Sequence, residues 1–262
     1  MDKNDIKIAF FDIDGTLVSF ASHNIPDSTR HALDRLSENG VEIVIATGRG
    51  AEPIKEIEGV PYSAIIGLNG SECALKDGSI LYRHSIPLEM FERVLELGKK
   101  YDFAVAAKFK EGFVVDRITP RVEEMSARIG SPCPPVRDLS ALYQLEGTGQ
   151  MCIFTNPETE RKVMGQVPLL SSSRWCDTFA DLNLRGVDKG SGVRDYLQLR
   201  GYTKDDAISF GDGGNDIPML RNTGIGVAMG NARDELKRMA DYITDDIDNN
   251  GLFNALKHFG LV

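Results

Sequence analysis

The stretch Phe10-Phe11-Asp12-Ile13-Asp14-Gly15-Thr16 decides the fold, because an apolar run that begins at Ile6 ends there in two carboxylates. A buried strand that ends in acids is costly unless a cation or a reaction uses them. Side chains alternate along a strand, so Asp12 and Asp14 are expected to point the same way. A hard dication with oxygen ligands would relieve their repulsion. The sequence therefore predicts a metal-assisted carboxylate site.

Composition limits the class of protein. The chain has 262 residues, of which 42% are apolar, and a formal net charge of −9. This length is enough for one large domain or two smaller ones. The acidic balance makes nucleic acid and anionic membranes poor partners. The apolar run at the N-terminus is too short for a signal peptide or a membrane span, so we expect a cytoplasmic protein, a monomer or a weak homo-oligomer.

Strand and helix patterns alternate at both ends of the chain. Near-uniform apolar runs separated by helices are typical of a parallel sheet that is buried on both faces. The sequence therefore predicts an α/β fold whose core is a doubly wound, Rossmann-like parallel sheet. The strands expected in this core cover residues 6–11, 41–46, 64–68, 207–210, 225–228 and 242–244.

The middle of the chain has a different pattern, in which helices accompany hairpins. Its expected helices cover residues 87–101, 119–130 and 157–167, and its expected strands cover 103–109, 112–116, 151–155 and one or two segments of 174–184. About a hundred residues is within the usual size of a domain. We therefore predict a core formed by residues 1–83 and 187–262, with an α+β cap domain, residues 84–186, inserted into it.

Unusual polar clusters follow four of the predicted core strands. In a parallel sheet the ligand crevice lies beyond the carboxyl ends of the strands, so these clusters are expected to meet at one edge. Chance placement would scatter them, and their coincidence predicts an active site there. The clusters are Asp12 to Thr16, Thr47-Gly48-Arg49, Asn69-Gly70 and Gly211-Asp212-Gly213-Gly214-Asn215-Asp216.

A second group of acids and one lysine extend this prediction. Asp212 and Asp216 can coordinate a dication from the side opposite to Asp12. Asp216 also opens a predicted helix and can be simply its N-cap, an alternative that is weaker for Asp212. Lys189 lies in the first turn of a predicted helix, where the macrodipole favours acids. Neutralising a phosphate or an acyl phosphate explains a lysine at that position better than solvation does.

These residues carry a family resemblance. The stretch Asp12-Ile13-Asp14-Gly15-Thr16 resembles the first motif of the haloacid dehalogenase superfamily. Thr47, Lys189 and the segment Gly211 to Asp216 resemble its second, third and fourth motifs. The inserted middle domain and Thr47-Gly48-Arg49 resemble the Cof-type sugar-phosphate phosphatases. Four motifs in the right order at strand ends are highly specific, and none of their positions departs from the family pattern.

The resemblance implies a Mg²⁺-dependent phosphatase that hydrolyses phosphate monoesters of sugars or similar small metabolites. Asp12 would be the nucleophile that forms an aspartyl-phosphate, and Asp14 the general acid and base. Thr47 would bind a phosphoryl oxygen, and Lys189 would offset negative charge. The implied metal ligands are Asp12, Asp14 through its backbone carbonyl, Asp212 and Asp216. The implied substrate-binding residues are Thr16, Gly48, Arg49, Asn69, Gly70 and Asn215.

Two other functions remain open. A phosphosugar mutase of similar architecture would return the phosphoryl group to another hydroxyl, and free phosphate release would separate it from a phosphatase. A non-catalytic phosphosugar sensor, or a receiver-like acceptor phosphorylated at Asp12, belongs to a different class. The complete set of Asp12, Asp14 and Lys189 argues against a sensor without activity.

A cap that excludes water would suit phosphate ester hydrolysis, with hinges expected near residues 82–87 and 184–188. The groups that read the leaving alcohol are expected in its last strands. Aromatic residues in strand patterns usually pack in a core, so that alternative stays open for Trp175 and Phe179. The candidates are Arg174, Trp175, Phe179, Asp181 and Arg185.

Overall fold

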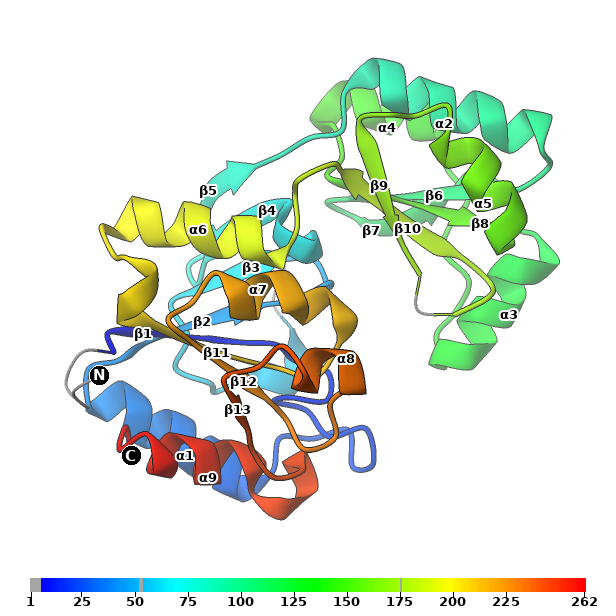
Figure 1. The fold of residues 1–262 in the computed structure, drawn as a ribbon. Coiled ribbons are helices and arrows are strands. Elements are labelled where there is room, and N and C mark those ends of the chain that lie inside the picture. Colours follow the sequence, from blue (N-terminus) through cyan, green and yellow to red (C-terminus); the bar gives the residue numbers. More distant parts are fainter. Residues whose placement is uncertain (1–5, 52–53, 175) are drawn as a thin grey trace. The chain divides into compact units, whose positions relative to one another are not determined.

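The computed structural model describes residues 6–51, 54–174 and 176–262 (Figure 1). The chain divides into two compact units, Met1–Tyr82 with Val187–Val262, and Arg83–Gly186. The chain passes from one unit to the other between Tyr82 and Arg83 and returns between Gly186 and Val187. Both points lie within the segments expected to act as hinges. Within the described ranges, no helix combines the length and the apolar character needed to cross a membrane.

The first unit is built around an eight-stranded sheet with the order β13-β12-β11-β1-β2-β3-β4-β5. The strands from β13 to β3 pair in parallel, and β4 runs antiparallel to β3. Its strands are β1 (Ile8–Phe11), β2 (Glu42–Ala46), β3 (Ala64–Gly67), β4 (Glu72–Leu75), β5 (Ile80–Arg83), β11 (Ala207–Gly211), β12 (Ile225–Ala228) and β13 (Tyr242–Ile243). Its α-helices are α1 (Asp27–Glu38), α6 (Lys189–Arg200), α7 (Ile217–Arg221), α8 (Asp234–Lys237) and α9 (Gly251–His258).

Strand β1 lies at the centre of this sheet because both of its faces are apolar. All four of its residues are buried, and Phe11 stacks on Phe210 of β11 with ring centroids 4.9 Å apart. Helices α1 and α9 lie together on one face of the sheet, and α6 and α7 lie together on the other (Figure 1). This arrangement confirms the doubly wound α/β core.

The second unit is a five-stranded antiparallel sheet with helices. Its strand order is β7-β6-β8-β10-β9. Phe91, Val105 and Ile153 belong to the apolar cluster on one face, whereas Val122 of α3 packs in the cluster on the other. Its elements are α2 (Leu88–Lys100), β6 (Ala104–Phe109), β7 (Gly112–Val115), α3 (Pro120–Ile129), α4 (Leu139–Glu146), β8 (Gln150–Phe154), α5 (Pro157–Met164), β9 (Leu170–Ser173) and β10 (Ala180–Leu184).

Three elements differ from the sequence prediction. The pattern analysis missed α4, although Asp138 caps it by accepting hydrogen bonds from the backbone N–H of Ser140 and Ala141. Strand β9 precedes the segment expected to contain it, because its three serines give no apolar alternation; it pairs with β10, and Leu170 packs in the core. The sequence pattern also predicts a helix over residues 232–240, whereas the structure has only the shorter α8 there.

Candidate active site

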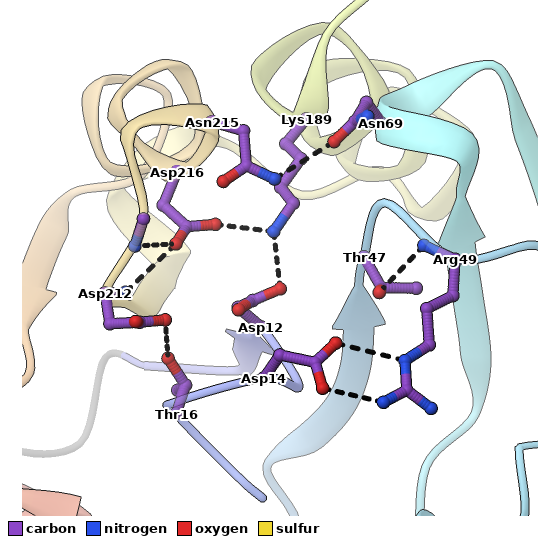
Figure 2. A network of polar contacts seen from close by, with 11 residues as sticks. Asp12, Asp14, Thr16, Thr47, Arg49, Asn69, Lys189, Asp212, Asn215 and Asp216 are labelled. Carbon is purple, nitrogen blue, oxygen red and sulfur yellow. Dashed lines mark hydrogen bonds and ion pairs between the residues drawn. The ribbon is translucent and has the colours of Figure 1, made fainter. Parts of the chain in front are cut away.

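The carboxyl ends of β1, β2, β3 and β11 meet at one edge of the sheet, and the predicted site residues gather there (Figure 2). Asp12 follows β1 and Thr47 follows β2. Asn69 lies in the short 3₁₀ turn Leu68–Gly70 after β3, and Asp212 follows β11. The convergence results from parallel pairing, which places equivalent strand ends side by side.

Lys189 joins two carboxylates that come from distant parts of the chain. Its Nζ lies 2.5 Å from Asp12 Oδ1 and 2.6 Å from Asp216 Oδ1 (Figure 2). The lysine and Asp216 have no exposed side-chain surface, and Asp12 is also buried. Burial alone would lower the pKa of Lys189, but the two carboxylates outweigh it and raise the pKa, so the lysine stays charged.

The start of α6 fixes the position of Lys189. Asp188 is the N-cap of this helix, and it accepts a hydrogen bond from the backbone N–H of Ser191 at 2.8 Å. Ser191 in turn accepts from the backbone N–H of Asp188 at 2.9 Å, which completes a capping box. Gly70 makes room for this cap, because a Cβ there would lie 2.2 Å from the carbonyl oxygen of Asp188.

Asp216 also organises the loop after β11. Its Oδ2 accepts hydrogen bonds from the backbone N–H groups of Asp212 and Gly213, at 3.0 and 2.8 Å. Thr16 donates to Asp212 Oδ1 at 3.3 Å, so the first loop contacts the same carboxylate. Carboxylate oxygens of Asp12, Asp212 and Asp216 lie within 4.8 Å of one another.

This cluster of three acids and one lysine is short of positive charge. Burial and the charge of Asp216 raise the pKa of Asp212 to about 7 against the opposing effect of Lys189. Burial also raises the pKa of Asp12, with Lys189 opposing it. Three hard carboxylate oxygens with a deficit of positive charge fit a dication such as Mg²⁺. Asp12, Asp212 and Asp216 are the side chains that can hold it.

Gly15 allows the first loop to approach Asp212. Its φ of +87° favours glycine, and a Cβ there would lie 2.4 Å from Asp212 Oδ2. The carbonyl oxygen of Gly15 accepts a hydrogen bond from Asn231 Nδ2 at 2.8 Å. The sequence analysis missed Asn231, although it follows the predicted strand 225–228 and the same strand-end rule points to it.

Asp14 turns away from Asp12, so the expectation that both point the same way is wrong. The strand ends at Phe11, and beyond it the alternation of a strand no longer applies. Asp14 instead accepts two hydrogen bonds from the Arg49 guanidinium, at 3.0 Å from Nε and 2.6 Å from Nη2 (Figure 2). Arg49 Nη1 also lies 2.9 Å from Glu56 Oε1. No sequence pattern singled out Glu56.

The loop after β2 is tied to the loops after β3 and β11. Thr47 is buried, and its Oγ1 accepts a hydrogen bond from the backbone N–H of Arg49 at 3.1 Å. Asn69 accepts a hydrogen bond from Asn215 Nδ2 at 3.1 Å, and a Cβ at Gly48 would lie 3.4 Å from Asn69 Oδ1. Residues of the three loops therefore lie next to one another beside the acids.

Most of the cap residues that were candidates for recognising the leaving alcohol make their contacts within the second unit. Arg174 pairs with Glu160 at 2.7 Å, and Arg185 donates to two backbone carbonyls. Phe179 packs beside Phe154. The remaining candidates are Asp181, which accepts from the Cys152 thiol at 2.9 Å, and Trp175, which lies outside the described residues.

The acid cluster predicts a pH-dependent stability in the absence of metal. With its pKa raised from 3.8 to about 7, Asp212 binds more protons in the folded than in the unfolded state. Stability should therefore fall as the pH rises between these two values. We expect metal-free protein to melt at a lower temperature at about pH 8 than at about pH 6, and Mg²⁺ to raise the Tm more at the higher pH.

Thermal melts with chelator or with Mg²⁺ at both pH values measure this effect. Asp212→Asn is the matched variant, and it should reduce both the pH dependence and the response to Mg²⁺. An equal Mg²⁺ response at the two pH values would contradict the charge deficit.

Comparison with known proteins identifies the family. The family model of the haloacid dehalogenase-like hydrolases matches residues 9–256. The solved structure of a phosphatase of the haloalkanoate (HAD) enzyme superfamily from Bacteroides thetaiotaomicron is 43% identical, with a TM-score of 0.94, over 98% of this chain and 96% of that one. The solved structure of a sugar phosphatase of HAD subclass IIB is 33% identical, with a TM-score of 0.87. This match covers 98% of this chain and 100% of that one.

A curated relative extends the comparison to a third phosphatase. The 5-amino-6-(5-phospho-D-ribitylamino)uracil phosphatase YcsE of Bacillus subtilis is 27% identical over 98% of this chain and 97% of its own. The family match spans all four motif positions together with the inserted unit. The chain therefore belongs to the haloacid dehalogenase-like hydrolase family, and it is a phosphatase, a phosphoric monoester hydrolase.

Proposed function

We propose that this phosphatase is Mg²⁺-dependent and hydrolyses phosphate monoesters of sugars or similar small metabolites through an aspartyl-phosphate on Asp12. The observation that carries the proposal is a pair of buried ion pairs, in which Lys189 joins Asp12 to Asp216 beside Asp212. Several carboxylates gathered around a single buried lysine are costly, and a site that binds a dication and a phosphate explains why they are there.

Asp12 is suited to attack phosphorus. Lys189 holds Oδ1, whereas Oδ2 accepts no hydrogen bond within the part of the chain that the structure describes. In the first step a carboxylate oxygen of Asp12 bonds to phosphorus while the bond from phosphorus to the leaving oxygen breaks. Water then attacks the phosphorus of the aspartyl-phosphate, which releases inorganic phosphate and restores the carboxylate.

Asp14 is the proposed proton carrier for both steps. It gives a proton to the leaving alcohol in the first step and takes one from the attacking water in the second. Its carboxylate is paired with Arg49, so before the first step it has to leave the guanidinium, take up a proton from solvent and turn to the leaving oxygen. Glu56 keeps a second ion pair with Arg49, so the guanidinium retains a carboxylate partner when Asp14 turns away.

A charge count supports the need for a dication. Asp12, Asp212 and Asp216 contribute three negative charges, and a phosphate monoester adds about two. Lys189 returns only one positive charge. When bound, Mg²⁺ would offset the charge between the carboxylates and the phosphoryl group. Asp12, Asp212 and the backbone carbonyl of Asp14 are the proposed nearest ligands, and Asp216 contributes through Lys189 and the loop after β11.

The other predicted residues are proposed to bind the phosphoryl group. The Thr47 hydroxyl donates to one of its oxygens, and Asn215 donates from the loop after β11. Thr16, Gly48, Arg49 and Gly70 complete the proposed substrate side, and Asn69 lies beside Asn215 there. The sugar class is supported by the solved relative that is a sugar phosphatase. The cytoplasmic location and the hinged closure of the cap stay predictions.

The test is release of free phosphate from a panel of phosphorylated metabolites, with and without a chelator. We expect turnover of one or more sugar phosphates with Mg²⁺, a fall to background with EDTA, and recovery when Mg²⁺ is added back. Phosphoryl transfer to another hydroxyl without free phosphate would indicate a mutase instead. Full activity in EDTA would contradict the proposed use of the acid cluster.

A further inference from the structure

Asn69 lies in a turn with left-handed backbone angles, which most residues adopt only when the surrounding structure holds them there. Leu68, Asn69 and Gly70 have φ values of +50°, +53° and +97°, all in the left-handed region. Glycine adopts this region freely and asparagine tolerates it, but leucine rarely does. Three such residues in succession at the end of β3 show that the surrounding structure holds this turn in place.

Hydrogen bonds to the loop after β2 hold the turn. The backbone N–H of Leu68 donates to the Arg49 carbonyl at 2.7 Å, and the backbone N–H of Asn69 donates to the Thr47 carbonyl at 3.0 Å. Leu68 is buried, so its side chain anchors the turn in the core. The backbone of Asn69, and with it the direction of its Cα–Cβ bond, is therefore set by the fold.

The Asn69 amide contacts one of the loops that are assigned to the phosphoryl group and lies close to the other. Its Oδ1 accepts a hydrogen bond from Asn215 Nδ2 at 3.1 Å (Figure 2). The same amide lies over Gly48, where an added Cβ would lie 3.4 Å from Oδ1 and 3.5 Å from Nδ2. Asn69 thus bridges the residue next to Thr47 and the loop that follows β11.

We propose that Asn69 is a positioning residue that acts through Asn215. By accepting one N–H of the Asn215 amide, it fixes the plane of that amide and leaves the second N–H free for a phosphoryl oxygen. Asn215 is exposed, so without this contact its side chain would rotate and lose its orientation. The inference rests on the proposed function, in which Asn215 binds the phosphoryl group.

Asn69→Gly is the sharpest single variant, because glycine keeps the left-handed backbone and removes only the side chain. We expect about a tenfold fall in kcat/KM and about a tenfold weaker inhibition by inorganic phosphate, the effect of one well-placed hydrogen bond. Asn250→Gly is the matched control, because Asn250 also has a left-handed φ, of +60°, and lies at the start of α9, outside the residues assigned to the site. It should change both constants by less than about twofold, and both variants should melt like the parent protein.

A double variant tests whether Asn69 acts through Asn215. We expect Asn69→Gly with Asn215→Ala to lose no more activity than Asn215→Ala alone, because the second change removes the group that Asn69 orients. Losses that multiply would show that Asn69 acts by itself, and an Asn69→Gly variant with parental constants would also overturn the inference. A parent protein with no turnover in the same assay would refute the proposed function and this inference with it.

Discussion

Asp12→Asn is expected to abolish phosphate release, with a fall of more than about 10⁴-fold in kcat. The amide has nearly the same shape as the carboxylate but cannot form the acyl phosphate. The fold should persist, because the amide oxygen can still accept the hydrogen bond from Lys189, and Asp216 still pairs with that lysine at 2.6 Å. Phosphate release at high enzyme concentration measures the loss, and circular dichroism checks the fold.

The control is Asp34→Asn, which makes the same charge change at an exposed position on α1. It should retain parental activity. Acid-quenched parent enzyme should carry a phosphoryl group on the peptide that contains Asp12, and the Asp12→Asn variant should not. Turnover by this variant within tenfold of the parent would remove Asp12 as the nucleophile.

Lys189→Met should destabilise the metal-free protein by about 3–5 kcal/mol and abolish activity. Methionine fills the space left by the lysine stem but leaves Asp12 and Asp216 buried without a cation. Removing one partner of a buried pair costs far more than the pair itself contributes, because the remaining charge is not compensated. Added Mg²⁺ should restore part of the stability, since it offers the carboxylates another cation, but not the activity.

Urea unfolding with chelator and with Mg²⁺ measures both effects. Lys257→Met on α9 is the matched control, because this lysine is exposed and the same substitution there removes no buried charge. It should shift the free energy of unfolding by less than about 0.5 kcal/mol. The ion-pair argument fails if Lys189→Met is as stable as this control without metal.

The placement of the acids was predictable because it depends on sheet topology. Apolar runs identify the strands, and parallel pairing brings their carboxyl ends together wherever they lie in the sequence. Asp12 and Asp212 are far apart along the chain but were expected at one edge from this rule alone, whereas Lys189 was singled out by its place in the first turn of a predicted helix and by the family resemblance. The same rule, applied to the strand before Gly230, would have found Asn231 as well.

Contacts between side chains in the loops were not predictable in this way. The pairing of Asp14 with Arg49 depends on where β1 ends, and the end of a strand is poorly marked by hydrophobic periodicity. The contact of Asn69 with Asn215 depends on a left-handed turn that includes a leucine, a residue type that gives no signal for that conformation. Sequence patterns therefore identify which strand ends form the site, whereas tertiary packing decides how the side chains pair.

The central place of β1 also has a consequence for protein synthesis. Ile8 in β1 pairs with Glu42 on one side and with Ala207 on the other. The ribosome thus makes the whole of Arg83–Gly186, a contiguous unit, before the second neighbour of β1 exists. The nascent chain must keep one edge of its most apolar strand unpaired for that interval, which makes this edge a natural target for a chaperone.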